Sequence, residues 1–406
     1  MRAVFVNYAH PDTPHVSAMR IRYFAEAMAQ RGHQVLLVTS TLNEHEISKD
    51  KEQVRKELEM HDGSRPFHLA CSPVWRWSLR KVRNKNTHPF VRKALVAYNY
   101  LCRGGVFSDW TAGSKAYWPV IADTFSPDIT WGTFGSIDSW VIARGIARES
   151  KCPWVMDAKD RWESFIPPLL RKLLARRFRD TGGLTTNSEF LAREFGHWFS
   201  RDGEVVYSGV NEVWTAATSE PQEGFRVMLV GCTYCPQTLA RFVSGFRDWL
   251  ESLDQAIRMR VSFCYAGCSA ENVRLATGGL RNLCTVDIQP YLPLPELAKK
   301  CREAAANVYM WYDKTFHHKL VELLCCRRPI VCFPGEREES INLAASVGGN
   351  LLVCRDETDI VRVFSGILMG KFVSEVNSTR LESLTWASQA GRLEAYFELV
   401  KRNGKV

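Results

Sequence analysis

Short apolar runs alternate with helical patterns along most of this 406-residue chain, and that rhythm constrains its fold more than any other feature. Val4–Tyr8 is typical of a buried strand, and a helix then begins near Ser17, because the apolar residues that follow recur at i, i+3, i+4 and i+7. Gly32 ends that helix, and Val35–Val38 is the next strand. A strand, a helix, a glycine and a strand in this order predict a βαβ unit, and hence a parallel sheet.

The same rhythm runs in two series. After a less regular region at 41–120, the first series continues with strands at Pro127–Trp131, Pro153–Asp157, Leu184–Asn187 and Glu204–Val210 and a helix at Ser139–Glu149. The second series has strands at Arg226–Val230, Arg260–Tyr265, Leu283–Ile288, Asn307–Trp311, Pro329–Phe333 and Asn350–Val353. The polar, aperiodic stretch Thr215–Gly224 between them is interpreted as a linker.

Chain length agrees with two α/β domains of about 200 residues each. We predict an N-terminal domain at 1–217 and a C-terminal domain at 218–383, both doubly wound. The last helix, within 384–406, carries one apolar face and is long enough to return to the first domain. Ligands of such sheets bind beyond the carboxyl ends of the strands, so we expect the site in a cleft between the two halves.

Charge is concentrated in one segment. Residues 65–115 contain ten Lys and Arg and a single acid, Asp109, which accounts for the whole net charge of +9. A second basic cluster lies at 171–179, and Trp75 and Trp77 stand among the cations of the first. This pattern favours an anionic membrane surface or a lipid-linked acceptor, with a plain solvated face as the alternative; no nucleic-acid motif is found.

The first residues do not read as a signal peptide, and no run approaches the roughly 18 apolar residues that span a bilayer. Thirteen cysteines, mostly within apolar runs, fit a reducing compartment. We therefore expect a cytoplasmic protein, which could lie at the inner face of the membrane. Cys232, Cys235, Cys264 and Cys268 follow neighbouring strands and leave a zinc site open as a minor alternative.

The stretch Asp313–Glu336 carries the most chemical information. A helix is expected to begin near His317, where free backbone N–H groups suit a diphosphate. Lys319 adds a positive charge, and Glu322, three residues on, lies on the same face, where its carboxylate could accept the hydroxyls of a ribose. The alternative is a surface ion pair of about 0.3 kcal/mol.

Several segments occur in the order found in one enzyme family. They are HVSAMRIRYFAEAMAQRGHQVLLVTS, PWVMDAKDRWE, TTNSEFL with VVYSGVNE, VMLVGCTY, YLPLPELAKKCREAAANVYMWY and the K-x-x-E helix followed by P-I-V. Together they cover most of the chain, and they resemble the family-four retaining glycosyltransferases. That resemblance implies the GT-B fold, in which two Rossmann-like domains face each other across a cleft and a C-terminal helix crosses back.

The resemblance also implies roles for particular residues. In the C-terminal domain, the donor sugar nucleotide would be bound by Gly231, Thr233, Tyr234, Lys314, Lys319 and Glu322. In the first loop and helix, His15, Ser17 and Arg20 would lie near the transferring sugar and its phosphates. Lys314 stands where many members have a second Glu, and the usual Gly-Gly of the first loop is absent.

Asp160 follows a predicted strand end and is the first candidate for orienting or deprotonating an acceptor hydroxyl, with His10 and His15 as further candidates. A surface pairing of Asp160 with Arg161 is an equal alternative. The chain has no Asp-x-Asp pair, so a metal-bridged diphosphate is not indicated, and the resemblance implies retention of configuration without a metal or other cofactor.

The sequence thus predicts a glycosyltransferase that moves a sugar from a nucleoside diphosphate to a hydroxyl of a glycan or lipid-linked glycan, in bacterial-type cell-surface glycan or glycolipid synthesis. Two alternatives stay open: a GT-B protein that binds sugar nucleotide or glycan without turnover, and a sugar-nucleotide epimerase.

Overall fold

The computed structural model describes residues 1–13, 15–43, 46–216, 223–314 and 316–404. The chain forms two compact units, one of Met1–Ser208 with Trp386–Val406 and one of Gly209–Thr385. The linker predicted at Thr215–Gly224 lies mostly outside the described residues, as does the predicted boundary at 217/218.

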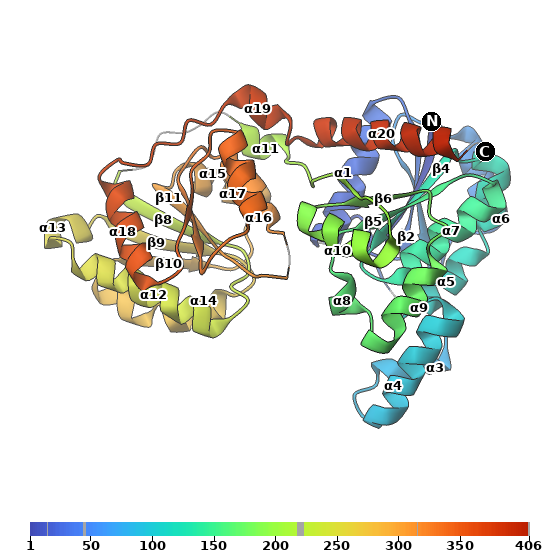
Figure 1. Cartoon of the computed structure of the whole chain (residues 1–406), viewed down its shortest axis with the longest axis horizontal. Helices are drawn as coiled ribbons and strands as arrows, with labels where there is room; N and C mark the ends of the chain where they lie inside the picture. The colour runs from blue at the N-terminus through green and yellow to red at the C-terminus, as the bar shows by residue number, and fades with distance from the viewer. Residues whose placement is uncertain (14, 44–45, 217–222, 315, 405–406) are drawn as a thin grey trace. The chain divides into compact units, whose positions relative to one another are not determined.

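Unit 1 is built on a seven-stranded parallel sheet with the order β3-β2-β1-β4-β5-β6-β7. Helices surround this sheet (Figure 1). Its strands are β1 (Arg2–Val6), β2 (Gln34–Ser40), β3 (Phe67–Cys71), β4 (Ile129–Phe134), β5 (Trp154–Ala158), β6 (Gly183–Thr186) and β7 (Glu204–Val205). The helices before β4 are α1 (Val16–Gln30), α2 (Lys51–Met60), α3 (Trp77–Arg83), α4 (Pro89–Tyr98), the π-helix η1 (Asn99–Arg103), α5 (Ser108–Lys115), α6 (Trp118–Val120) and the π-helix η2 (Ile121–Phe125). Those after β4 are α7 (Ile137–Ser150), α8 (Trp162–Phe165), the 3-10 helix η3 (Pro168–Leu170), α9 (Arg171–Arg177), α10 (Glu189–Phe199) and α20 (Trp386–Asn403).

Alternating side chains of the strands point to opposite faces of this sheet, and hydrophobic clusters cover both faces. Phe5 packs edge-on against Trp131 of β4 and Phe397 of α20, and Phe24 of α1 packs against the same Trp131. Val4, the neighbour of Phe5, points to the other face, among residues of β2, α5 and α7. Because both faces are covered, the central strands are buried almost throughout, as in parallel sheets generally. The last helix therefore belongs to the first unit, as its apolar face predicts.

Unit 2 repeats the plan with a six-stranded parallel sheet in the order β10-β9-β8-β11-β12-β13. Its strands are β8 (Phe225–Val230), β9 (Val261–Ala266), β10 (Thr285–Gln289), β11 (Ala306–Met310), β12 (Ile330–Phe333) and β13 (Leu351–Val353). Its helices are α11 (Glu212–Thr215), α12 (Pro236–Glu251), α13 (Gln255–Arg258), α14 (Ala270–Ala276), the 3-10 helix η4 (Gly278–Asn282), α15 (Leu294–Arg302), α16 (His318–Leu324), α17 (Glu338–Ser346), α18 (Glu357–Leu368) and α19 (Ser378–Glu382).

All six strands predicted for the second series are present within two residues of their expected ends. In the first series, the strand expected at Glu204–Val210 is only two residues long, because the chain leaves the sheet after Val205. The region 41–120, where no strand was expected, supplies the edge strand β3 and several helices. Within the described part of the chain, no helix is long and apolar enough to cross a membrane.

Candidate functional site

Strand order determines where a ligand site is expected in each unit. The order reverses between β1 and β4 in unit 1 and between β8 and β11 in unit 2. Ligands of open α/β sheets bind beyond the carboxyl ends of the strands at such switch points. The loops that follow these four strands are therefore the first places to look, and they contain most of the predicted site residues.

In unit 2 the loop after β8 and the start of α16 meet at the switch point. Gly231 has φ +86°, and a Cβ placed on it would lie 3.6 Å from Cε of Lys319. The left-handed backbone favours glycine here, while the lysine stem lies at ordinary contact distance from the position of that Cβ. The structure thus brings together Gly231 and Lys319, which are 88 positions apart in the sequence.

Lys319 and Glu322 form an ion pair, with 2.7 Å between Nζ and Oε2. Glu322 is buried, with 4% of its surface exposed, so the pair is not the surface pair of the alternative interpretation. Partial burial acts to lower the pKa of Lys319, but the attraction of Glu322 outweighs it and the pKa is raised. The ammonium also lies 5.9 Å from the ring centre of Trp214. A permanently charged cation thus stands at the switch point, held by a buried carboxylate.

Aromatic rings border this cation. Tyr234, whose φ of 54° is unusual for a residue other than glycine, stacks on Tyr312 with ring centres 4.8 Å apart. The ammonium of Lys314 lies 5.6 Å from the ring centre of Tyr312. His317 stands at the N-cap position of α16, and its Nε2 accepts a hydrogen bond at 2.8 Å from the backbone N–H of Tyr312. Burial lowers the pKa of His317 to about 4. The neutral ring of His317 thereby holds the loop that carries Tyr312.

Thr233 is buried in the loop after β8, and its backbone N–H donates to Oγ of Ser269 at 3.2 Å. Cys232, Cys235, Cys264 and Cys268, the possible zinc ligands, do not gather into a metal-binding group. Among the residues that the structure describes, no three His, Cys, Asp or Glu side chains are arranged to hold a metal ion.

In unit 1 a second polar group forms around the end of β5. Lys159 and Asp160 follow this strand, and their side chains pair at 3.2 Å between Nζ and Oδ2. The surface pair between Asp160 and Arg161 is absent, because Arg161 pairs with Glu194 instead, at 2.7 Å. His15 lies within electrostatic reach: burial and then the charge of Lys159 lower its pKa, while Asp160 acts to raise it. Lys159 is a site candidate that the sequence alone did not single out.

Ser17 and Arg20 serve the scaffold in this structure. Ser17 exchanges hydrogen bonds with Asn7, which fastens the start of α1 to the loop after β1. Arg20 is 2% exposed and binds Asp157 in a bidentate pair, with distances of 3.1 Å and 2.8 Å. Its remaining N–H groups reach Val206 O and Ser208 Oγ. A phosphate could bind Arg20 only by displacing these partners.

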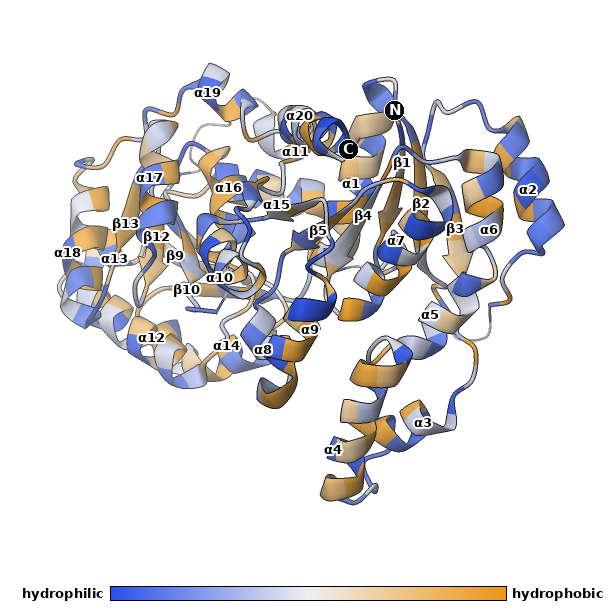
Figure 2. Ribbon diagram, turned by 45° about the vertical axis from the view of Figure 1, so that its right-hand side comes forward, coloured by the Kyte–Doolittle hydropathy of each residue, from blue (hydrophilic) through white to orange (hydrophobic). Residues whose placement is uncertain are grey.

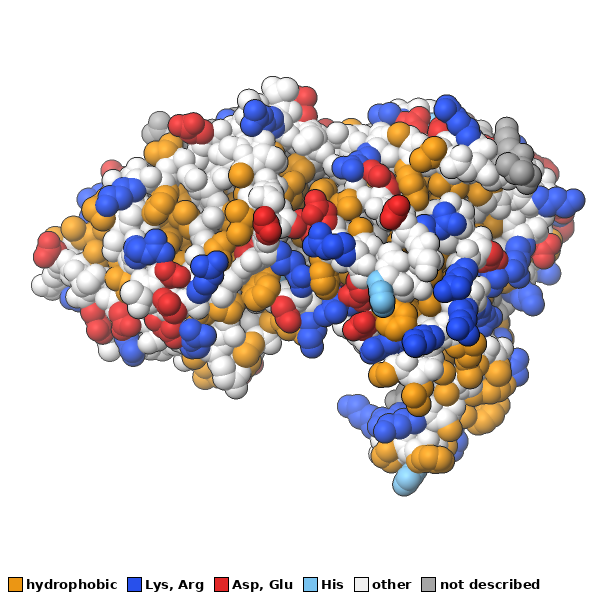
Figure 3. Space-filling view, in the orientation of Figure 1, with side chains coloured by type: hydrophobic (Ala, Val, Ile, Leu, Met, Phe, Trp, Pro, Cys, Tyr) orange, Lys and Arg blue, Asp and Glu red, His pale blue; other side chains and the backbone are white. Residues whose placement is uncertain are grey.

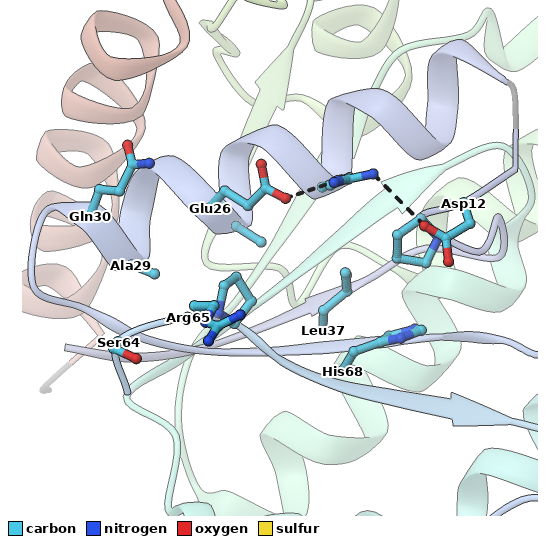
Figure 4. Close-up of a pocket in the computed structure, with 12 residues that line it drawn as sticks. Asp12, Glu26, Ala29, Gln30, Leu37, Ser64, Arg65 and His68 are labelled. Carbon is cyan, nitrogen blue, oxygen red and sulfur yellow. Dashed lines mark hydrogen bonds and ion pairs between the residues drawn. The ribbon is translucent and has the colours of Figure 1, made fainter. Parts of the chain in front are cut away.

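His10 lies on the other side of the first loop. Its ring packs edge-on against His68 of β3, with 4.7 Å between ring centres, and burial lowers the pKa of His68 to about 4. Beside them, a hollow of about 410 Å³ opens along α1, with Asp12, Glu26, Arg65 and His68 around it (Figure 4). No interaction in the described residues joins His10 directly to Asp160.

No family model matches the sequence, and the comparison with curated proteins gives no match. Solved structures match over the whole chain. Sucrose-phosphate synthase from Thermosynechococcus elongatus has a TM-score of 0.67 at 12% identity, and the match covers 99% of each chain. A glycosyltransferase from Rickettsia africae has a TM-score of 0.66 at 10% identity, also over 99% of each. HepE of Anabaena, in complex with UDP and glucose, has a TM-score of 0.57 at 11% identity over 99% of this chain and 98% of that one.

These likenesses establish the fold. The chain has the GT-B fold, with one Rossmann-like sheet in each unit and the last helix packed on the first.

Proposed function

We propose that this protein is a glycosyltransferase that uses a nucleoside-diphosphate sugar as donor. The observation that carries the proposal is the group at the switch point of unit 2, where Lys319 and the buried Glu322 meet the loop at Gly231. The match of the whole chain to a glycosyltransferase and to a UDP complex of the same fold supports it. At 10–11% identity these matches support a class of reaction rather than a particular donor.

Lys319 supplies what the departing group needs. When the bond between the anomeric carbon and the diphosphate breaks, negative charge gathers on the phosphate oxygens, and a fixed cation stabilises it. Glu322 accepts hydrogen bonds from the ribose hydroxyls once Lys319 turns to the phosphate. Tyr234 and Tyr312 offer flat rings at the edge of the same loop. The backbone at Gly231 forms the remaining part of the proposed donor site.

We assign the acceptor to unit 1. In the transfer, the bond from the anomeric carbon to the diphosphate oxygen breaks, a bond to the acceptor oxygen forms with retention of configuration, and the acceptor proton passes to Asp160. Lys159 holds that carboxylate in place through their ion pair. His10 and His15 are second candidates for the proton. We propose a glycan or lipid-linked glycan as acceptor, in cell-surface glycan or glycolipid synthesis at the cytoplasmic face of the membrane, and we expect no metal requirement.

Binding to a panel of nucleoside-diphosphate sugars tests the donor site first, through the rise in melting temperature that a ligand of the native state produces. For the sugar nucleotide that binds, Lys319→Ala and Glu322→Gln should each raise the Kd about 10- to 100-fold, as expected for a lost charged hydrogen bond. Lys371→Ala, which removes an exposed cation of the same unit, is the matched control. Unchanged affinity in both site variants would refute the assignment.

Turnover separates transfer from the alternatives. Sugar-nucleotide hydrolysis or transfer by the wild-type chain, lost in Asp160→Asn, supports the transferase. Binding without turnover of any donor or acceptor supports a non-catalytic protein. The reason to consider this alternative is Lys314, which stands where the family usually has Glu. A changed sugar recovered without any acceptor identifies an epimerase. The anomeric configuration of the product, read by proton NMR, decides between retention and inversion.

A further inference from the structure

Two helices of unit 1 expose apolar side chains instead of burying them in a hydrophobic core. α3 and α4 project from the rest of the unit (Figure 2). None of the ten residues of α4 is buried, although most of them are apolar. Phe90 is 75% exposed, and Trp75, in the segment leading into α3, is 70% exposed. We call the exposed residues of 74–98 the α3–α4 surface.

The charge of this surface is almost wholly positive. Asp109, the one acid of residues 65–115, is buried and paired with Arg83 at 2.7 Å, so it offers no negative charge outside. Arg80, Lys81 and Lys93 form no ion pair with any residue in the described ranges. Figure 3 shows blue and orange side chains intermixed over this part of the molecule. A face that only needs to be solvated has no reason to expose tryptophan and phenylalanine among its cations.

A second segment of the same character adjoins the first. Leu169 of η3 is 96% exposed, and Leu173 of α9 is exposed beside Lys172 and Arg176. Hydrogen bonds tie this segment to η1, which directly follows α4: Tyr100 Oη donates to Phe165 O at 3.1 Å, and Arg177 Nη1 donates to Leu101 O at 3.1 Å. Two stretches some 70 residues apart in sequence therefore extend one apolar and basic surface.

Between α3 and α4 lies a hollow of about 420 Å³. Its lining combines the apolar side chains of Trp77, Val91 and Leu95 with Lys81 and the ring of His88. The hollow thus has an apolar wall beside a cation, a combination suited to the boundary between an acidic lipid headgroup and its acyl chain.

We propose that the α3–α4 surface, together with Leu169 and Leu173, docks this protein on an anionic lipid bilayer. Cations attract acidic headgroups, while exposed aromatic and aliphatic side chains enter the interface, and stable attachment takes both. Nucleic acid would engage the cations but leaves the aliphatic side chains in water. The surface therefore fits a membrane better than a polynucleotide.

Cosedimentation of the full chain with vesicles tests this without any sugar nucleotide, so its result does not depend on the proposed function. Binding should be strong to phosphatidylcholine vesicles containing about one third phosphatidylglycerol, weak to pure phosphatidylcholine, and reduced as salt rises from about 0.05 to about 0.2 M. Failure to bind the acidic vesicles overturns the proposal. Tight binding of a single-stranded oligonucleotide, without vesicle binding, points to nucleic acid instead and also overturns it.

Variants locate the surface. Arg80→Gln, Lys81→Gln and Lys93→Gln combined should lower the partition to acidic vesicles at least tenfold, since each cation contributes about fivefold. Arg274→Gln, Arg281→Gln and Lys371→Gln combined remove the same charge from exposed positions of unit 2, and should change it little. A similar loss in both triple variants would mean that net charge alone drives binding, which refutes a defined surface.

The apolar contribution has its own variants. Trp75→Ala, Phe90→Ala and Leu169→Ala combined should lower binding at high salt more than the charge variant does, because the apolar term is not screened. All three side chains are exposed, so the fold should be kept, which an unchanged circular dichroism spectrum and melting temperature would verify. Unaltered binding in this variant contradicts insertion at the interface.

Discussion

Replacing Arg20 by methionine separates a structural from a ligand-binding role for this residue. Asp157 is fully buried, and both its carboxylate oxygens accept from the Arg20 guanidinium. In Arg20→Met the carboxylate keeps the hydrogen bond from Thr185 Oγ1 at 2.9 Å but loses its countercharge. Breaking a buried pair in this way costs about 3–5 kcal/mol, and the bond from Thr185 favours the lower end of that range.

This loss of free energy should appear as a lower melting temperature of unit 1. For a unit of about 230 residues, 1 kcal/mol shifts the melting temperature by about 2–4 °C, so a loss of about 3 kcal/mol predicts a fall of about 10 °C. Differential scanning calorimetry and urea unfolding measure it. Arg22→Met, two residues on in the same helix, is the control, because Arg22 makes an exposed pair with Glu26 worth less than about 0.5 kcal/mol.

A double change tests the cause. Arg20→Met with Asp157→Leu removes both buried charges, and should recover part of the stability that Arg20→Met loses. The reasoning is refuted if Arg20→Met melts within about 2 °C of Arg22→Met, since that would be a loss of only about 1 kcal/mol. A normal melting temperature with a strongly reduced kcat would instead place Arg20 at the phosphates, as the family resemblance implies.

Two further predictions concern the other unit and the last helix. Burial lowers the pKa of His317 to about 4, so as the pH falls this residue is protonated in the unfolded chain before it is protonated in the folded one. The contribution of His317 to the free energy of unfolding of unit 2 should therefore decline between about pH 6.5 and about pH 4, and should not change below that. His317→Gln should flatten that slope in urea titrations, and an unchanged slope would mean that another group causes it. Phe397→Ala removes a fully buried ring from the core of unit 1 and should cost about 3–5 kcal/mol in thermal unfolding, whereas Leu399→Ala, exposed on the same helix, should cost little; equal losses would contradict the packing of α20.

Local patterns predicted most of the secondary structure. The strands of both sheets and the helix that contains Lys319 are apolar runs and helical periods that can be read within a few residues. The edge strand β3 was missed, because its five residues FHLAC alternate weakly and lie in an irregular region. Its place in the sheet depends on pairing with β2, for example Leu69 with Val38, which no local pattern specifies.

The candidate site also combines features that are local in the sequence with features that depend on the tertiary structure. The spacing of Lys319 and Glu322 on one face of a helix is a local property, and so is the run of cations among aromatic residues at 75–83. The family resemblance implied a place near the phosphates for Arg20, and the sequence alone did not single out Lys159. Arg20 pairs with Asp157, 137 residues away, and the charge of Lys159 acts on His15, 144 positions away in the sequence.

What the sequence determined by itself was therefore most of the order of strands and helices, the position of the helical Lys–Glu pair and the uneven charge, since each follows from neighbours along the chain. Only the tertiary structure decided that Gly231 lies against Lys319, that Glu322 is buried, and that the apolar residues of α4 are left exposed. Burial and contact depend on which strands become neighbours in a sheet, and that is settled by the packing of the whole unit.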